Sequence, residues 1–176
     1  MNPLLYILIT VILISVSGIL LAPKTNNILF AWLWFNVFIA IYEFYIVWKR
    51  NEMVMYKDIG ENMDFWNTSS TDYFWRDAWG EYSYNSDRRY LEPTDFVYWI
   101  EFGNAIIVLL LWMAFISNNM LLVKVLLVIQ AYHCGIYFLS WYYTYGNTRF
   151  SNLQEIYLGI SALWIICPVA LLFILK

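Results

Sequence analysis

Apolar residues fall in five long runs along the chain, at roughly 3–22, 27–48, 95–116, 119–143 and 153–175. Each run has about the 20 residues that an α-helix needs to cross a hydrocarbon layer of roughly 30 Å. Polar positions do not alternate with apolar ones inside the runs, as they would in a transmembrane β-barrel. Helices satisfy their own backbone hydrogen bonds in lipid. The pattern therefore predicts an all-α membrane protein with five transmembrane helices.

The first run has the position of a signal peptide, but it lacks a basic region in front of the apolar stretch. Ala22-Pro23-Lys24 also leads directly into the second run. We interpret residues 1–24 as an N-terminal transmembrane helix that is retained. Residues 27–176 then form the main membrane domain.

A polar segment at about 49–93 interrupts this pattern and carries most of the acidic and basic residues of the chain. It is also rich in aromatic residues, in which flexible linkers are poor. We expect a short amphipathic element there, which lies on the membrane or caps the helical bundle.

Composition agrees with a membrane protein, because 62% of the residues are hydrophobic and only 13% are charged. About half apolar is usual for a globular domain. The net charge of −3 and the lack of a basic run exclude nucleic acid as an expected partner. Cys134 and Cys167 both lie in apolar runs, so we expect two buried free thiols and no disulfide framework.

Two carboxylates, Glu43 and Glu101, lie well inside predicted spans. A charge in that position costs at least about 2.5 kcal/mol, so an acid within the membrane marks a candidate functional site. The alternative is that each side chain reaches water from near a helix end. Lys49 and Arg50 follow Glu43 closely, and Asp95 precedes Glu101 by less than about two turns.

The two acids allow two kinds of function. Removal from water disfavours a charged carboxylate, so one acid could stay protonated while the other accepts a proton, as in general acid–base catalysis. Equally, two carboxylates among aromatic rings could bind a hydrophobic amine without any reaction. Composition does not separate these alternatives.

Other polar residues in the predicted spans are more typical of helix packing than of catalysis. They are Asn36, Asn104, Gln130, His133, Ser140 and Ser161. His133 is the only histidine, and one histidine is too few for a usual metal site, so we expect no metal. The chain has no phosphate-binding glycine loop and no other cofactor motif, and we expect no cofactor.

Four stretches between about 27 and 175 match a known family in order and with nearly constant spacing. They are Trp79-Gly80-Glu81-Tyr82 through Asp87-Arg88-Arg89-Tyr90; the step from Tyr90 to Tyr98-Trp99-Ile100-Glu101; Gln130-Ala131-Tyr132 followed by Ile136-Tyr137-Phe138-Leu139; and Ala162-Leu163-Trp164 with Pro168. With these the chain resembles the emopamil-binding protein (EXPERA domain) family, which includes a sterol 8,7-isomerase and the sigma-2 receptor.

The resemblance implies a four-helix EXPERA-type core plus the N-terminal helix. It implies a sterol 8,7-isomerase-like enzyme of the endoplasmic reticulum that shifts a ring double bond in a cavity within the membrane. Its catalytic residues would be Glu43, Glu101 and Trp164, and the partner a membrane lipid, in particular a sterol. A homodimer is a further expectation. The implied ligand-binding residues are Tyr90, Trp99, Asn104, Gln130, His133, Tyr137 and Ser161.

The chain departs from the isomerase pattern at a few positions. Ile39 stands where the isomerase has a histidine, and His133-Cys134 replaces a Gly-Asp pair. Ser161 stands where the family has an asparagine. These departures keep an alternative open, a non-catalytic sterol- or amine-binding membrane protein resembling the sigma-2 receptor. A purely structural bundle subunit is a third hypothesis.

Overall fold

The computed structural model describes residues 3–24, 26–59, 79–80, 82–84, 87–92, 96–146 and 158–175. Every regular element in these ranges is a helix. The elements are α1 (Pro3–Leu21), α2 (Asn27–Trp48), α3 (Arg50–Met53), α4 (Met55–Ile59), the 3₁₀ turn η2 (Arg88–Leu91), α6 (Phe96–Ile116), α7 (Met120–Tyr145) and α9 (Leu163–Ile174).

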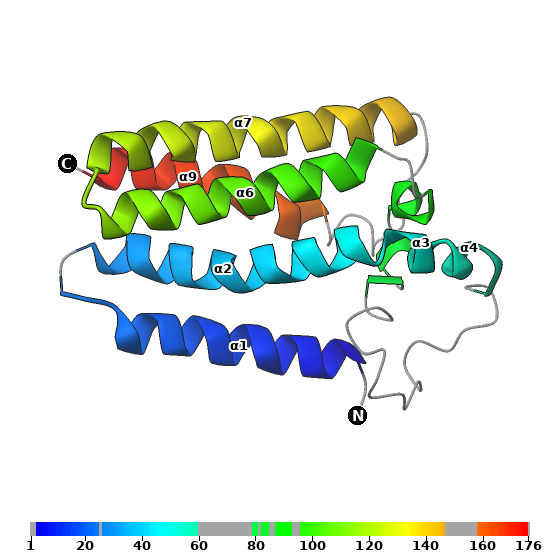
Figure 1. Cartoon of the computed structure of the whole chain (residues 1–176), viewed down its shortest axis with the longest axis horizontal. Coiled ribbons are helices and arrows are strands. Elements are labelled where there is room, and N and C mark those ends of the chain that lie inside the picture. Colours follow the sequence, from blue (N-terminus) through cyan, green and yellow to red (C-terminus); the bar gives the residue numbers. More distant parts are fainter. Residues whose placement is uncertain are drawn as a thin grey trace.

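The long helices form a bundle in which neighbours in the sequence lie side by side (Figure 1). α1 packs on α2, α2 on α6, α6 on α7, and α7 on α9. A tight turn joins α6 to α7. There Asn118 takes a left-handed backbone conformation with φ 55°, and the side chain of Asn119 accepts a hydrogen bond from the backbone N–H of Leu122. Such a cap satisfies one of the free amides at the start of a helix. The short connection makes α6 and α7 antiparallel neighbours.

Three helices, α2, α6 and α7, are long and apolar enough to cross a membrane. The apolar lengths described in α1 and in the C-terminal segment, Ile9–Leu21 and Leu158–Ile174, are shorter. The prediction of an all-helical fold is therefore confirmed for the described residues. The predicted number of five spanning helices is not confirmed.

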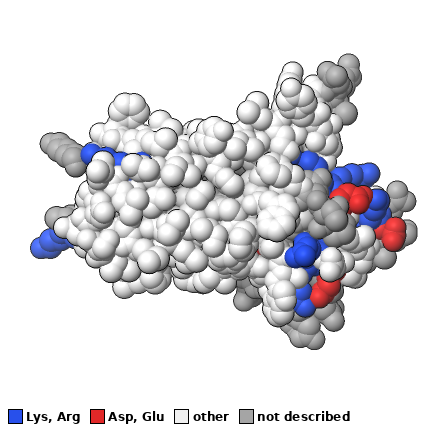
Figure 2. Space-filling view, turned by 45° about the horizontal axis from the view of Figure 1, so that its top comes forward, with Lys and Arg blue, Asp and Glu red and all other residues white. Residues whose placement is uncertain are grey.

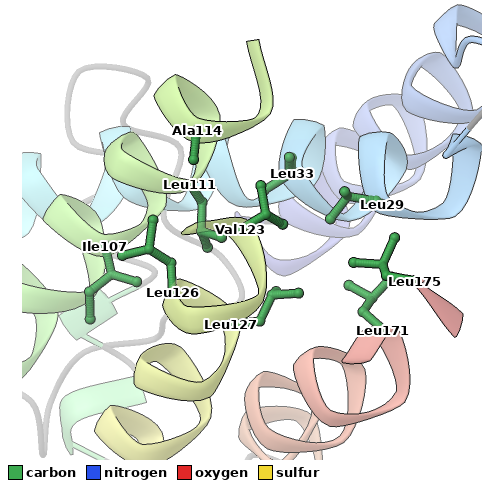
Figure 3. Packing of buried hydrophobic residues seen from close by; sticks show 10 residues of the cluster. All are labelled: Leu29, Leu33, Ile107, Leu111, Ala114, Val123, Leu126, Leu127, Leu171 and Leu175. Carbon is green, nitrogen blue, oxygen red and sulfur yellow. The ribbon is translucent and has the colours of Figure 1, made fainter. Parts of the chain in front are cut away.

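Aliphatic side chains fill the end of the bundle that holds the α6–α7 turn (Figure 3). They come from α2, α6, α7 and the end of the C-terminal helix, so this cluster joins helices that are far apart in the sequence. In lipid there is little hydrophobic gain between helices, and close van der Waals packing holds them together instead. The cluster consists of Leu29, Leu33, Ile107, Leu111, Ala114, Val123, Leu126, Leu127, Leu171 and Leu175.

The opposite end of the bundle carries the short elements α3, α4 and η2 (Figure 1). Acidic and basic side chains gather at that end, while the long body of the bundle shows almost none (Figure 2). Among the described residues, exposed ion pairs at this end join Lys49 with Glu52, at 2.6 Å, and Lys57 with Glu92. The described part of the 49–93 segment therefore covers one end of the bundle and is the boundary between its apolar body and water.

Candidate functional site

The two predicted acids come together between α2 and α6. Glu43 is only 4% exposed, and its Oε1 accepts a hydrogen bond of 2.6 Å from Nδ2 of Asn104. Asn104 and Glu101 lie three residues apart on α6 and so share one face of that helix. The carboxyl group of Glu101 is close enough to that of Glu43 for the two to interact. The alternative that Glu43 reaches water is thus excluded by its burial.

One oxygen of this pair lacks a donor. Glu43 Oε2 is buried without a hydrogen-bond partner among the described residues, although the carboxyl group of Glu43 interacts with that of Glu101. Two carboxylates have no hydrogen to share, whereas a carboxylic acid and a carboxylate do. A proton between Glu43 and Glu101 would therefore supply the missing bond and remove one of two like charges from the apolar interior.

Tyr90 donates a hydrogen bond from its hydroxyl to Oε1 of Glu101. It reaches the acid from η2, and Tyr98 of α6 anchors it by donating to its backbone carbonyl. Burial raises the pKa of Tyr90, and the negative charge of Glu101 raises it further. The phenol therefore stays a protonated donor. The two acids are thus distinguished by their donors, an amide for Glu43 and a phenol for Glu101.

Trp164 belongs to a second polar group, deeper in the bundle. Its indole Nε1 donates to Asn36 Oδ1 at 3.0 Å, and Gln130 Nε2 donates to the same oxygen at 3.3 Å. Trp32 Nε1 in turn donates to Gln130 Oε1 at 3.3 Å. Asn36 precedes Glu43 by seven residues on α2, which is about 10 Å along a helix. The indole nitrogen of Trp164 is therefore fixed two turns away from the acids.

His133 contacts the backbone of α6 instead of the acids. Its Nε2 lies 2.6 Å from the carbonyl oxygen of Ile100, and its ring packs on Gly103 so closely that a Cβ there would lie 2.7 Å from Cε1. Because a carbonyl only accepts, Nε2 carries the hydrogen. No bond joins His133 to Glu43 or Glu101 in the part of the chain that the structure describes. His133 is therefore held by the backbone of α6 and not by either acid.

The remaining implied ligand-binding residues lie in different surroundings. Trp99 is 67% exposed on α6, and its ring packs on Phe102. The backbone carbonyl of Ser161 lies 3.6 Å from Sγ of Cys134. Of the implied site residues, the structure brings Glu43, Glu101, Asn104 and Tyr90 into one cluster. Trp99 lies away from it.

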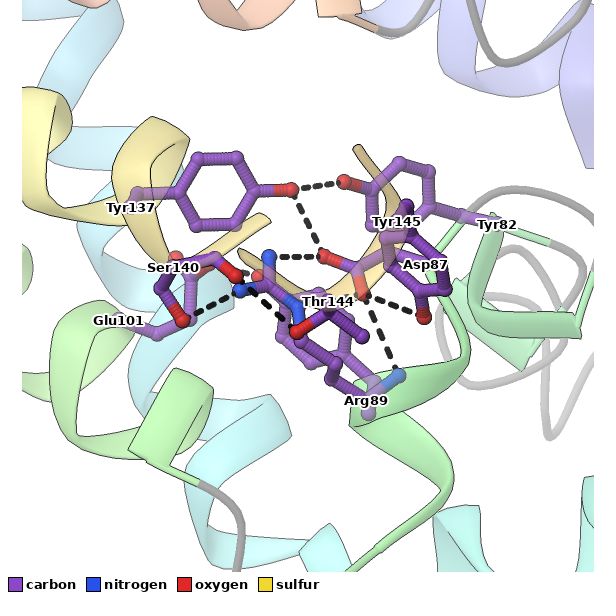
Figure 4. Close-up of polar contacts among 9 residues, drawn as sticks. Tyr82, Asp87, Arg89, Glu101, Tyr137, Ser140, Thr144 and Tyr145 are labelled. Atoms are coloured by element: carbon purple, nitrogen blue, oxygen red, sulfur yellow. Dashed lines mark hydrogen bonds and ion pairs between the residues drawn. The ribbon is translucent and has the colours of Figure 1, made fainter. Parts of the chain in front are cut away.

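Sequence reasoning did not single out a buried ion pair beside this cluster (Figure 4). Asp87 is fully buried and binds the guanidinium of Arg89 with both oxygens, at 2.8 and 2.6 Å. Tyr137 and Tyr145 of α7 donate to the same carboxylate, at 2.9 and 3.4 Å. Arg89 also donates to Oγ of Ser140, at 2.7 Å. The only signal in the sequence was the Asp87–Tyr90 motif itself, which does not say what these side chains contact.

The guanidinium of Arg89 and the phenol of Tyr82 both have raised pKa values and keep their hydrogens. Burial lowers the pKa of Arg89, but its hydrogen bonds and charge interaction with Asp87 raise that pKa by more. Burial raises the pKa of Tyr82, and the negative charge of Asp87 raises it further. The hydroxyl of Tyr82 lies 2.6 Å from that of Tyr137, so the phenols form a hydrogen-bonded chain that ends on Asp87.

Comparisons with protein-family models, with curated proteins and with solved structures found no match for this chain. No group of three or more His, Cys, Asp or Glu side chains that could hold a metal ion occurs among the described residues. The geometry alone therefore defines the class of this protein. It is a bundle with three helices long and apolar enough to cross a membrane. Between two of them the buried Glu43 and the half-buried Glu101 bring their carboxyl groups together.

Proposed function

We propose that the chain is a membrane protein in which Glu43 and Glu101 move a proton to and from an apolar lipid, in the manner of a sterol 8,7-isomerase. In this proposal α1 and the C-terminal segment also span the bilayer, which gives five spans. The observation that carries it is the approach of a buried carboxyl group on α2, that of Glu43, to the half-buried carboxyl group of Glu101 on α6. The endoplasmic reticulum and a sterol ligand enter from the family resemblance.

The chemistry follows from one shared proton. Asn104 donates to Glu43 and Tyr90 donates to Glu101, which leaves Glu43 Oε2 as the oxygen that needs the proton. The acid form gives its proton to one carbon of a ring double bond, and a carbocation forms at the other carbon. A carboxylate then removes a proton from the neighbouring carbon, and the double bond re-forms one position along. The lipid gains one proton and loses one, so no oxidant or cofactor is needed.

The surroundings suit a cationic intermediate. A low dielectric strengthens the attraction between a carboxylate and a cation, and exclusion of water keeps the cation from being trapped. The resemblance gives Trp164 the role of stabilising the cation with its ring. Its indole nitrogen is occupied by Asn36, so the ring faces, and not the N–H, would serve this role.

A second candidate is a non-catalytic binding protein for a sterol or a hydrophobic amine. It is favoured by the absence of a histidine at Ile39 together with the position of His133, which is bound to the Ile100 carbonyl. A protonated amine would be attracted to the same two carboxyl groups, and no proton transfer to carbon would be needed.

The test supplies the purified chain in lipid nanodiscs with an 8-ene sterol in deuterated water. Isomerase activity gives the 7-ene product with deuterium at one ring carbon. Glu101→Gln and Glu43→Gln should each remove turnover, because each variant removes one proton-handling carboxyl group. The matched control is Glu52→Gln, the same chemical change in an exposed ion pair with Lys49, and it should leave turnover unchanged.

The two candidates give different results. Saturable binding of the 8-ene sterol without 7-ene product or deuterium would support the binding protein and overturn the isomerase. If the chain forms no product and binds neither a sterol nor an amine, both candidate functions are overturned. Normal turnover in Glu101→Gln would show that the reaction does not use the pair.

A further inference from the structure

Two buried side-chain atoms lack a hydrogen-bond partner among the described residues, and the proposed function uses only one of them. That one is Oε2 of Glu43, which would receive the shared proton. The other is the indole nitrogen of Trp79, Nε1, whose hydrogen has no acceptor. A buried donor without an acceptor is costly, and native proteins rarely keep one without a reason.

Other indoles of the chain do pair their N–H groups. Among the described residues, four partly buried tryptophans donate to an oxygen at 2.9 to 3.3 Å. The pairs are Trp32 with Gln130, Trp34 with Ser17, Trp112 with the backbone of Leu33, and Trp164 with Asn36. Trp79 departs from this rule, so its free N–H is a distinct feature of the place where it lies.

The backbone at Trp79 is closely packed, so the free N–H does not come from a loosely held segment. Gly80 is buried against the ring of Tyr56 on α4, and a Cβ at Gly80 would lie 2.6 Å from that ring. Ser83 Oγ donates to the backbone carbonyl of Trp79 at 2.6 Å. These contacts fix the indole at the charged end of the bundle, where α4 lies.

Tyrosine rings connect the indole to the two acids. Tyr42 directly precedes Glu43 on α2, and the hydroxyl of Tyr90 donates to Glu101. Both rings meet the indole of Trp79 nearly at right angles, with centroids 5.2 Å apart. A ring face accepts an N–H only weakly, so these contacts do not replace an oxygen acceptor. The indole is thus separated from Glu101 by the single side chain of Tyr90.

The chemistry of an indole N–H limits what can bind to it. It only donates, so its partner must carry a lone pair, as a hydroxyl or carbonyl oxygen does. A protonated amine has hydrogens but no lone pair and cannot take this place. A lipid keeps its oxygen near the membrane surface, because an unpaired polar group in hydrocarbon is costly. Trp79 lies at that end of the bundle.

We infer that Trp79 is a specificity-determining residue, whose indole N–H binds the hydroxyl or carbonyl oxygen of a neutral lipid while the apolar body of that lipid extends to Glu43 and Glu101. This inference rests on the proposed function, since it names the class of ligand for the same acid pair. It selects a sterol-like alcohol over a hydrophobic amine.

The experiment measures equilibrium binding to the full-length chain in nanodiscs with two probes, an 8-ene sterol and its 3-deoxy analogue, which lacks the hydroxyl group. The affinity ratio of the two probes is compared between variants, because their different partitioning into lipid then cancels. Trp79→Phe keeps an aromatic ring and removes the N–H. It should lower the preference for the sterol by roughly three- to tenfold, the size of one neutral hydrogen bond. The matched control is Trp48→Phe, the same change at an exposed indole, and it should keep the wild-type ratio.

A merely structural role for Trp79 predicts that Trp79→Phe weakens both probes equally. That result, or an unchanged ratio, would overturn the inference. If Trp79→Phe does not give a monodisperse helical protein, the wild type decides through ultraviolet resonance Raman spectroscopy. The indole N–H band should then shift on addition of the sterol and not of the 3-deoxy analogue, and equal spectra with both probes would overturn the inference.

Failure of the inference and failure of the proposed function give different results. Isomerase turnover without a preference that depends on Trp79 keeps the reaction and overturns the inference. A preference that depends on Trp79 without turnover supports the inference and overturns only the isomerase. If neither probe binds, the inference is overturned together with the sterol as ligand.

Discussion

Replacement of Glu43 by glutamine should make the protein more stable although it removes the proposed activity. A glutamine has the shape of the glutamate, and its amide oxygen can accept the bond from Asn104 Nδ2 that is 2.6 Å long in the wild type. Its NH₂ group also supplies a donor towards Glu101, at the place where Glu43 Oε2 has no partner. Glu43 makes this bond only after it has taken up the shared proton, whereas glutamine carries its donor permanently, and the change removes an ionisable group from the interior.

The expected size follows from the bonds involved. One interhelical hydrogen bond within a membrane contributes about 0.6 kcal/mol on average and at most about 1.7 kcal/mol. We therefore expect Glu43→Gln to raise the free energy of unfolding by about 1 kcal/mol. The contrasting variant Asn104→Leu removes the donor to a buried carboxyl group and should lower it by about 1–3 kcal/mol. Glu52→Gln, in an exposed ion pair, should change it by less than about 1 kcal/mol.

The assay is reversible unfolding in mixed micelles with increasing denaturing detergent, followed by far-ultraviolet circular dichroism and tryptophan fluorescence. The wild type and the three variants are compared under identical conditions. A Glu43→Gln protein that is less stable than the wild type by more than about 1 kcal/mol would refute the reasoning. It would mean that Glu43 is an ionised group held by a cation, because only then does loss of its charge cost stability.

Three further results are expected. Asn36→Leu removes the acceptor for two interhelical bonds and should lower the free energy of unfolding by about 2 kcal/mol; a coupling energy near zero with Trp164→Phe in a double-mutant cycle would contradict this contact. Gly103→Val places a Cβ 2.7 Å from the ring of His133 and should cost about 1–3 kcal/mol, with partial rescue by adding His133→Ala; equal damage in both backgrounds would argue against the contact. Because burial raises the pKa of Tyr82 above its usual value near 10, its contribution to stability is complete below pH 10 and is lost as the pH rises through the folded value. Alkaline unfolding should therefore be shallower in Tyr82→Phe, and an unchanged pH dependence would contradict the assignment.

The helices themselves could be predicted from the chain because they depend on local composition. The runs at 27–48, 95–116 and 119–143 agree with α2, α6 and α7 to within two residues at each end. In lipid a backbone group has no water to bond with, so an apolar run of sufficient length has few alternatives to a helix. In the last run, residues 158–161 and 163–174 are helical, and the start of the run at 153–157 lies outside the described residues.

The acids were also visible in the sequence, since a carboxylate within an apolar run is rare and costly. Their pairing was not, because contact between Glu43 and Glu101 depends on the rotation of α2 against α6. The rotation of each helix about its axis is set by side-chain packing along the whole α2–α6 interface. The residue types at positions 43 and 101 do not reveal it. The same reason explains Asn36, which the sequence presents only as one more polar residue and which in the bundle accepts bonds from two other helices.

Asp87 and Arg89 show most clearly what tertiary structure adds. Their residue types and spacing predict a charged turn near the membrane surface, where such a pair is usually solvated and contributes little. In the folded chain both are buried, and α7 supplies three donors or acceptors to them from Tyr137, Tyr145 and Ser140. Burial turns a surface charge pair into a strong electrostatic element beside Glu101, because the same Coulomb interaction is far larger in a low dielectric. Local sequence therefore accounts for the helices and for the presence of the acids, whereas the environment that would give those acids a chemical role arises only when distant segments pack together.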